Sequence, residues 1–315
     1  STWSSYVWEA DFFNIQNNTF THFRTMENTG SVAYQDMCLN AGGANTTIVN
    51  NVLKNCGVGV FLTRTNFYYN HLQAQWGADD AVIEDNVFIN SETIDIWFSL
   101  NSYSDGVEIR NNEFKGSSSP SYGVYTQDRT TTDLVIEGNS FSNSQEAVYM
   151  RGALDWHIKD NTINGIGDSS KAGIYVRDGY GVIEGNTLVD ADGGILIDGV
   201  QFGYNANVTD NSISQSAGRT APAAVGIWAE DCGSSAVYTG GNTISVMENA
   251  LVTDGCDLTD TGSTLSAVGG SGGSVYTVQI NANAYNPGTV NANEGDTIRW
   301  LSLIHISEPT RPTPI

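Results

Sequence analysis

The 315-residue sequence predicts an all-β chain that winds as a right-handed parallel β-helix, a solenoid of about ten coils. Three observations predict this fold. A six-residue pattern, apolar-x-(Asn, Asp or Gly)-Asn-x-(Phe, Ile or Leu), recurs along the chain, and a second apolar strand lies between most of its copies. No stretch keeps the 3.6-residue period of a helix over three turns, because Gly and Asn interrupt it.

The repeated pattern marks one corner of each expected coil. Eight copies run from IQNNTF to VTDNSI, and TGGNTI is a degraded ninth. The central asparagines are Asn18, Asn51, Asn86, Asn112, Asn139, Asn161, Asn186, Asn211 and Asn242. The residue before each is Asn, Asp or Gly, the types that tolerate a left-handed backbone. We therefore expect a sharp turn after a short strand in each coil and a stack of Asn amides along the solenoid.

The second strand is seen at GVFLT, TIDIW, GVYTQ, AVYMR, GIYVR, GILID, GIWAE and ALVTD. Its first position is mostly Gly or Ala, and its second and fourth positions are mostly aliphatic. Period-two alternation turns the second and fourth side chains inward and the third and fifth outward. A β-sandwich would fit the strand spacing alone, but it does not explain a single turn signature every two or three strands.

These motifs resemble the right-handed β-helix repeats of the pectate-lyase-like superfamily, including the NosD-like repeat proteins of cell surfaces and the periplasm. The resemblance covers about residues 12–268. It implies the fold rather than an activity, because one fold hosts many functions. We assign residues 1–268 to the β-helix and residues 269–274 to a Gly/Ser linker.

Beyond the linker, residues 275–300 resemble the opening strands of a cupredoxin (plastocyanin-like) domain. The matching residues are Tyr285, Pro287, Gly295, Asp296, Thr297, Ile298 and Trp300. We expect an incomplete β-sandwich there, with copper bound only in an untruncated domain, because the family's copper ligands follow the tryptophan. Residues 301–315 resemble translated sequencing adapter, and three of the six prolines fall in the last seven residues, so this tail is left out of the expected fold.

The charge balance is strongly acidic, with 35 Asp and Glu against 13 Lys and Arg and a formal net charge of −22. Such a field repels nucleic acid and anionic membranes, and it suits solubility in salt or cation binding. No apolar run is long enough to span a bilayer, and the first residues include neither Met nor a basic segment. We expect a monomer whose start is cut or processed.

Two pairs of cysteines are candidates for disulfides. Cys232 and Cys256 share one offset in successive second strands, so stacking places them about 4.8 Å apart, within disulfide range. Cys38 and Cys56 fall in neighbouring coils at offsets that do not match, and for both pairs buried free thiols remain the alternative. A disulfide implies an oxidising compartment, so we expect an extracellular, cell-surface or periplasmic protein. The absence of a CxxC motif and the scarcity of His argue against zinc.

Parallel stacking gathers the outward positions of the second strands into two columns. The third positions are Phe61, Asp95, Tyr125, Tyr149, Tyr175, Leu196, Trp228 and Val252. The fifth positions are Thr63, Trp97, Gln127, Arg151, Arg177, Asp198, Glu230 and Asp254. Aromatic rings edged by charge suit sugar rings, so we predict that Tyr125, Tyr149, Tyr175 and Trp228 bind polysaccharide. The alternative is that the rings pack under loops or decorate a strand-rich surface.

The charged column is the candidate site for chemistry. Asp198, Glu230 and Asp254 would follow one another at about 4.8 Å per rung, near the carboxylate spacings of retaining and inverting glycosidases. They equally suit Ca²⁺. Arg151 and Arg177 would hold a uronate carboxylate, or one would be the base of a β-elimination beside calcium, as in pectate lyases. The alternative is an exposed ion pair between Arg177 and Asp198 that contributes little.

The preferred prediction is an exported β-helix protein that binds polysaccharide along this outer face. One alternative is a lyase, hydrolase or epimerase acting on an acidic polysaccharide. Another is a structural spacer that holds a copper-binding module.

Overall fold

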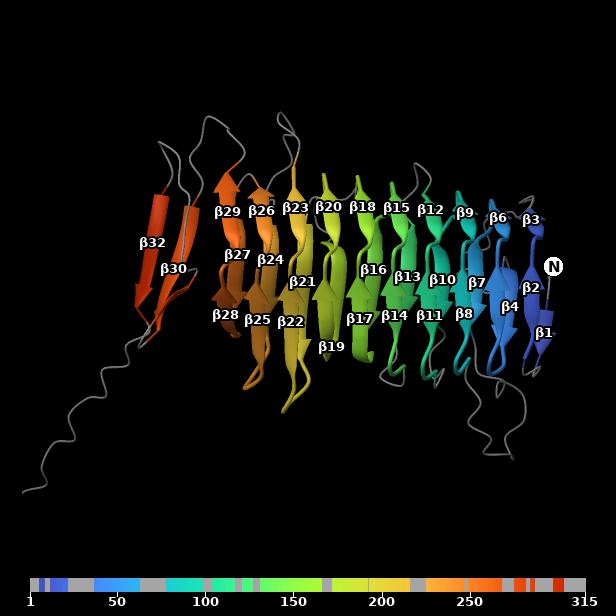
Figure 1. The fold of residues 1–315 in the computed structure, drawn as a ribbon, viewed down its shortest axis with the longest axis horizontal. Helices are drawn as coiled ribbons and strands as arrows, with labels where there is room; N and C mark the ends of the chain where they lie inside the picture. Colours follow the sequence, from blue (N-terminus) through green and yellow to red (C-terminus); the bar gives the residue numbers. More distant parts are fainter. Residues whose placement is uncertain are drawn as a thin grey trace, which may run out of the picture.

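The computed structural model describes residues 6–8, 12–21, 37–62, 78–98, 104–116, 121–126, 131–165, 172–191, 193–215, 225–246, 249–267, 275–281, 284–286 and 297–302. These residues form strands and the corners between them, with no helix in the described ranges. The strands stack in parallel along one axis (Figure 1), so the chain is a parallel β-helix, as the repeats predict.

Three parallel sheets form the faces of the solenoid, each with ten strands in the described ranges. Sheet A consists of β1 (Tyr6–Trp8), β4 (Met37–Gly42), β7 (Val58–Leu62), β10 (Ile94–Phe98), β13 (Tyr122–Thr126), β16 (Glu146–Arg151), β19 (Ala172–Glu184), β21 (Gly193–Val200), β24 (Val225–Glu230) and β27 (Asn249–Asp254). Sheet B consists of β2 (Asn14–Gln16), β5 (Thr47–Val49), β8 (Val82–Glu84), β11 (Glu108–Arg110), β14 (Val135–Glu137), β17 (Leu154–Lys159), the second half of β19, β22 (Asn205–Thr209), β25 (Ala236–Gly240) and β28 (Asp257–Thr261). Sheet C consists of β3 (Thr19–Thr21), β6 (Val52–Lys54), β9 (Val87–Ile89), β12 (Glu113–Lys115), β15 (Ser140–Ser142), β18 (Thr162–Asn164), β20 (Thr187–Val189), β23 (Ser212–Ser214), β26 (Thr243–Val246) and β29 (Thr264–Ala267).

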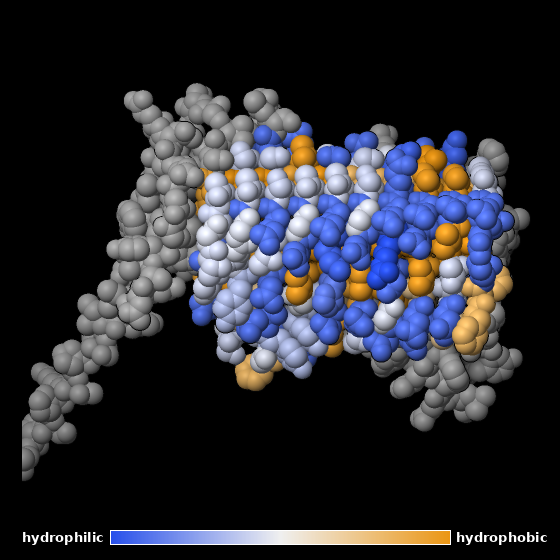
Figure 2. Space-filling model, viewed as in Figure 1, coloured by the Kyte–Doolittle hydropathy of each residue, from blue (hydrophilic) through white to orange (hydrophobic). Residues whose placement is uncertain are grey.

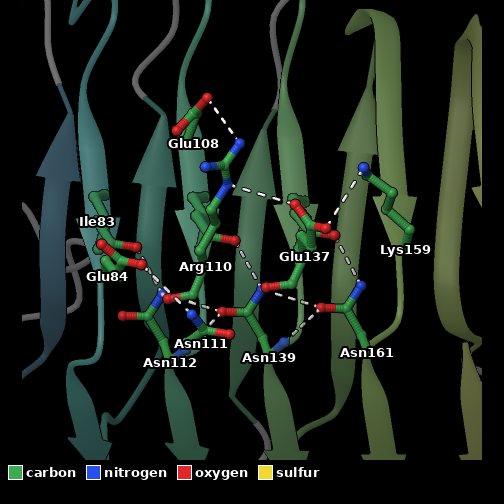
Figure 3. Close-up of polar contacts among 12 residues, drawn as sticks. Ile83, Glu84, Glu108, Arg110, Asn111, Asn112, Glu137, Asn139, Lys159 and Asn161 are labelled. Atoms are coloured by element: carbon green, nitrogen blue, oxygen red, sulfur yellow. Dashed lines mark hydrogen bonds and ion pairs between the residues drawn. The ribbon is translucent and has the colours of Figure 1, made fainter.

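The predicted asparagine stack lies at the corner between sheets B and C (Figure 3). Asn112 Oδ1 accepts the backbone N–H of Asn86 at 3.0 Å and its side-chain amide at 3.0 Å, while Asn112 Nδ2 donates to Ile83 O and to Asn139 Oδ1. The same contacts recur down to Asn242, where Ser263 takes the next place. Each amide thereby satisfies backbone groups that the sharp corner removes from the sheets.

The residue before each stacked asparagine has positive φ, from 53° at Asn111 to 67° at Gly185. Asp160, Gly185, Asp210 and Gly241 alternate at this position in four successive coils. A Cβ on either glycine would collide with the carboxylate of the aspartate one coil earlier, so each aspartate side chain covers the glycine that follows it. The corner therefore accommodates aspartate in one coil and glycine in the next.

The core runs the length of the solenoid and is closed by the inward side chains of all three sheets. Phe88, Phe114 and Phe141 of sheet C are fully buried and stack in sequence, with ring centroids 4.8 and 4.4 Å apart. In sheet A the second and fourth positions point inward in most coils, as Val60 and Leu62 do. The face formed by sheets B and C is mostly hydrophilic, with scattered hydrophobic residues (Figure 2).

The register expected for the coil containing TIDIW is wrong by two residues. In β10, Ile96 pairs with Val60 and Trp97 pairs with Phe61, so Trp97 takes the outward third position expected for Asp95. Asp95 instead takes the position that is Cys38 in β4 and Gly or Ala in the coils from β13 to β27, and it is 1% exposed. TIDIWF permits two alternations, and the observed one places the larger Phe98 in the core.

Two disulfides join neighbouring coils. Cys232 and Cys256 lie 4.8 Å apart between Cα atoms, the spacing of one rung, and Cys38 and Cys56 lie 5.5 Å apart. A separate three-stranded sheet follows the β-helix, formed by β30 (Val275–Asn281), β31 (Ala284–Asn286) and β32 (Thr297–Ser302). It contains an antiparallel pair, β30 with β31, unlike sheets A to C. Whether this sheet opens a cupredoxin domain stays a prediction.

Candidate functional site

The outward side chains of sheet A form two adjacent columns, because successive strands pair in register. The aromatic column is Phe61, Trp97, Tyr125, Tyr149, Tyr175, Leu196, Trp228 and Val252. The charged column is Arg151, Arg177, Asp198, Glu230 and Asp254. The structure thus brings together all nine residues singled out from the sequence for binding or catalysis, whereas Thr63 and Gln127 lie outside the described residues.

The aromatic column is closed at its N-terminal end. Phe61 and Trp97 are 7% and 6% exposed and pack with Met37, Val58 and Ile94 in a small cluster outside the sheet. From Tyr125 to Val252 the side chains are half-buried. The part of the column that a ligand can reach therefore begins at Tyr125, and for Phe61 the alternative of simple packing holds.

The tyrosines stack on one another rather than facing the solvent. The ring of Tyr149 lies 4.8 Å from that of Tyr125 at 15° and 4.8 Å from that of Tyr175 at 17°. Both faces of Tyr149 are therefore covered by neighbouring rings, which leaves its edge for contact with a ligand. Since Leu196 follows Tyr175 on the next rung, no further ring covers Tyr175 from that side.

Tyr122 joins the column without being expected from the sequence. Its ring makes edge-to-face contacts with those of Tyr125 and Tyr149, with centroids 4.9 and 5.7 Å away. It precedes Gly123, whose Cβ position would point at the core ring of Phe141. Because both Gly123 and Val124 face inward, strict alternation fails here, and Tyr122 points outward like Tyr125.

Asp198 is the most tightly held group of the charged column. The Tyr175 hydroxyl donates to Asp198 Oδ2 at 2.6 Å, and Arg177 Nε lies 3.4 Å from the same oxygen. The Asp198 side chain is 15% exposed and that of Arg177 is 41% exposed, so the carboxylate sits beneath the guanidinium. The negative charge of Asp198 raises the pKa of Arg177, which makes loss of the guanidinium proton harder.

Glu230 occupies the rung after Asp198 and has a different environment. Partial burial, followed by the negative charges of Asp198, Asp231 and Asp254, raises the pKa of Glu230. Burial, followed by the hydrogen bond to Asp198, likewise raises the pKa of Tyr175, which stays a neutral hydroxyl donor. A carboxyl whose pKa is raised thus lies one rung from a carboxylate that is hydrogen-bonded and ion-paired, and two carboxyls in different environments are what acid–base chemistry on a glycosidic bond uses.

Among the described residues, no group of three or more His, Cys, Asp or Glu side chains is arranged to hold a metal ion. Asp198, Glu230 and Asp254 follow one another along the column instead of converging on one point. The described ranges also include no helix long and apolar enough to cross a membrane.

Comparison with known families supports the fold. Residues 146–300 match the family model described as a right handed beta helix region, which agrees with the parallel coils and with the predicted handedness. This part of the chain is similar to that family and carries the whole charged column. No curated protein matches the chain.

Proposed function

We propose that the protein is exported and binds a polysaccharide along the outer face of sheet A, from Tyr125 to Trp228. The observation that carries the proposal is the register of the two columns, which sets half-buried aromatic side chains beside charged ones on the three rungs that begin at Tyr149, Tyr175 and Trp228. A repeating surface with one rung every 4.8 Å or so suits a repeating ligand. The two disulfides favour an oxidising compartment outside the cytoplasm.

The stacking of the tyrosines specifies how such a chain would be held. Because the faces of Tyr149 are covered, sugar rings would meet tyrosine edges and accept or donate hydrogen bonds at the hydroxyls. Leu196, on the rung after Tyr175, would add an apolar contact for the sugar ring. Arg151, which is exposed, would pair with a carboxylate on an acidic sugar.

A glycan array followed by titration calorimetry tests the proposal. The double variant Tyr175→Ala and Trp228→Ala should weaken binding about fivefold or more, because two aromatic contacts each worth about 0.5–1.5 kcal/mol are lost. His157→Ala on sheet B serves as the control and should leave the affinity unchanged. Equal affinity of the double variant and the wild type would show that the column does not bind the glycan.

The second candidate is a glycoside hydrolase acting on the bound chain, which the contrast between Glu230 and Asp198 favours. Glu230 would protonate the leaving oxygen, and Asp198 would act as nucleophile or as base toward water on the opposite side. The ion pair of Arg177 with Asp198 weighs against Arg177 as the base of a β-elimination. A hydrolase therefore fits the column better than a lyase does.

Product analysis on a panel of uronans and neutral glycans, with and without calcium, tests this candidate. New reducing ends without ultraviolet absorption indicate hydrolysis, and unsaturated uronate indicates a lyase. Glu230→Gln should lower the rate about 10²–10⁴-fold, whereas Glu184→Gln on sheet B should not change it. The absence of product on every glycan would leave binding as the function.

A further inference from the structure

A second aromatic surface lies on sheet B, at the connection from β21 to β22. Gln201–Tyr204 form a four-residue turn closed by Tyr204 N donating to Gln201 O at 3.0 Å, with φ of 84° at Gly203 as a type II turn requires. Ser235 Oγ on the following coil donates to the same oxygen at 3.0 Å. The turn is therefore built into the solenoid, and it projects at the bottom edge of Figure 1.

The turn displays aromatic rings to the solvent. Phe202 at its tip is 83% exposed, Tyr204 is 45% exposed, and Tyr238 on the next coil is 43% exposed. The ring of Tyr204 stacks on that of Tyr180, with centroids 4.0 Å apart and 11° between the planes. We call Tyr180, Phe202, Tyr204 and Tyr238 the turn patch. Phe202 contributes almost no buried surface to the fold, so packing does not explain why an aromatic ring stands at this position beside three others.

Uncharged polar side chains edge the turn patch. Gln201, Asn205 and Asn207 are all exposed, and Asn207 pairs across the strands with Tyr238. The amides of Gln201 and Asn207 each offer both a donor and an acceptor to a hydroxyl, whereas the Asn205 oxygen already accepts the Ala236 N–H at 3.3 Å. Burial, followed by the negative charge of Asp155, raises the pKa of Tyr180, so this carboxylate lies close to the turn patch.

We propose that the turn patch is a second carbohydrate-binding surface, specific for a neutral polysaccharide. Exposed ring faces beside amides match the apolar faces and hydroxyl edges of uncharged sugars. A protein partner would need an interface of roughly 20–30 residues, which four rings do not supply. An anionic lipid or glycan is disfavoured by the negative charge of Asp155 and by the lack of a basic side chain among the four residues of the patch.

This surface extends the proposed function to another face and does not require the columns of sheet A to bind. The two surfaces also differ in chemistry, since the patch has no basic side chain among the residues named here, whereas the columns contain Arg151 and Arg177. One molecule would then hold two glycan chains of different charge, joining a neutral polymer to an acidic one.

Affinity electrophoresis tests the proposal with galactomannan, xylan or mixed-linkage β-glucan cast in the gel, and with alginate or polygalacturonate in parallel gels. The wild type should be retarded in at least one neutral gel. Phe202→Ala with Tyr204→Ala should weaken that retardation about tenfold or more. Phe12→Ala removes an aromatic ring that is 78% exposed at the other end of the solenoid and should change nothing.

The variants separate this surface from sheet A and from effects on folding. Phe202→Ala alone removes no packed side chain and should also weaken retardation, with an unchanged unfolding midpoint. The sheet A variant, Tyr175→Ala with Trp228→Ala, should keep full retardation in the neutral gel. The proposal is overturned if the wild type runs freely in every neutral gel, or if the turn variants stay retarded. A dimer dissociated by Phe202→Ala, without retardation, would instead make the patch an interface between copies.

Discussion

Removing one amide from the middle of the asparagine stack should cost a large part of the free energy of unfolding. Asn186 is fully buried, and its Nδ2 donates to Ile158 O at 2.9 Å and to Asn211 Oδ1 at 2.9 Å. Its Oδ1 accepts the backbone N–H of Asn161 at 3.0 Å. Asn186→Ala leaves at least the Ile158 carbonyl and the Asn161 N–H without these partners inside the corner. At about 1–3 kcal/mol for each buried unpaired group, we expect a loss of about 2–6 kcal/mol.

Urea unfolding followed by circular dichroism, with both disulfides intact, measures this loss. Asn18→Ala is the matched control, because Asn18 is exposed and no stacked asparagine of an earlier coil donates to it among the described residues. That change should cost about 1 kcal/mol or less. If the two substitutions cost the same, or if Asn186→Ala costs under about 1 kcal/mol, the stack does not stabilise the corner in the way argued from its hydrogen bonds.

Three further predictions concern buried charge, backbone conformation and cross-linking. Burial raises the pKa of Asp95 to about 7, so the folded chain retains a proton that the unfolded chain releases near the ordinary pKa of 3.8. The stability that is present below about pH 4 should therefore fall by up to about 4 kcal/mol as the pH rises through about 7. Asp95→Asn should shrink the difference between the urea midpoints at pH 4 and pH 8. Gly138→Ala should cost about 1–2 kcal/mol more than Gly203→Ala in thermal unfolding. Both glycines have positive φ, but a Cβ at Gly138 would lie 2.7 Å from an amide oxygen of the preceding coil, whereas a Cβ at Gly203 would meet no atom within 4 Å. Replacing Cys232 and Cys256 together by Ser should lower the unfolding free energy by about 3 kcal/mol for a cross-link spanning 24 residues, and an unchanged midpoint in urea would contradict it.

The sequence predicts the coils because each corner depends on residue types with no ready substitute. The corner needs a buried side chain that both donates and accepts hydrogen bonds, and asparagine provides it. The residue before this asparagine must adopt a left-handed conformation, which Asn, Asp and Gly tolerate. The pattern therefore fixes the register of sheets B and C directly. The pattern also predicts which residues of sheet A are neighbours, provided that the number of residues between the sheet C strand and the next sheet A strand is the same in both coils.

Sheet A was harder to predict, because its apolar residues are interchangeable. In TIDIWF both Ile94 with Ile96 and Ile96 with Phe98 satisfy an inward alternation, and the observed choice buries Asp95 where most other coils have Gly or Ala. The Gly position itself breaks the alternation, since it and the next residue both face inward. A column inferred by counting residues therefore acquires errors of one or two positions in a single coil.

The mutual stacking of the tyrosines could not be predicted from their spacing. A column of outward aromatic residues at one rung each is compatible with rings lying flat on the sheet or standing on edge. At a spacing near 4.8 Å, rings on neighbouring rungs can stack in parallel, and they do so from Tyr125 to Tyr175. Whether ring faces or ring edges are presented depends on such neighbours, which a single coil does not reveal.

The alternation of aspartate and glycine at the corner before the stacked asparagines affects how such a solenoid can lengthen. Asp160 covers Gly185, and Asp210 covers Gly241, so the unit that repeats at this corner is a pair of coils. Duplicating or deleting a single coil would set aspartate on aspartate, with repelling charges, or glycine on glycine, with an uncovered backbone. In this part of the chain, changes in length made two coils at a time preserve the corner.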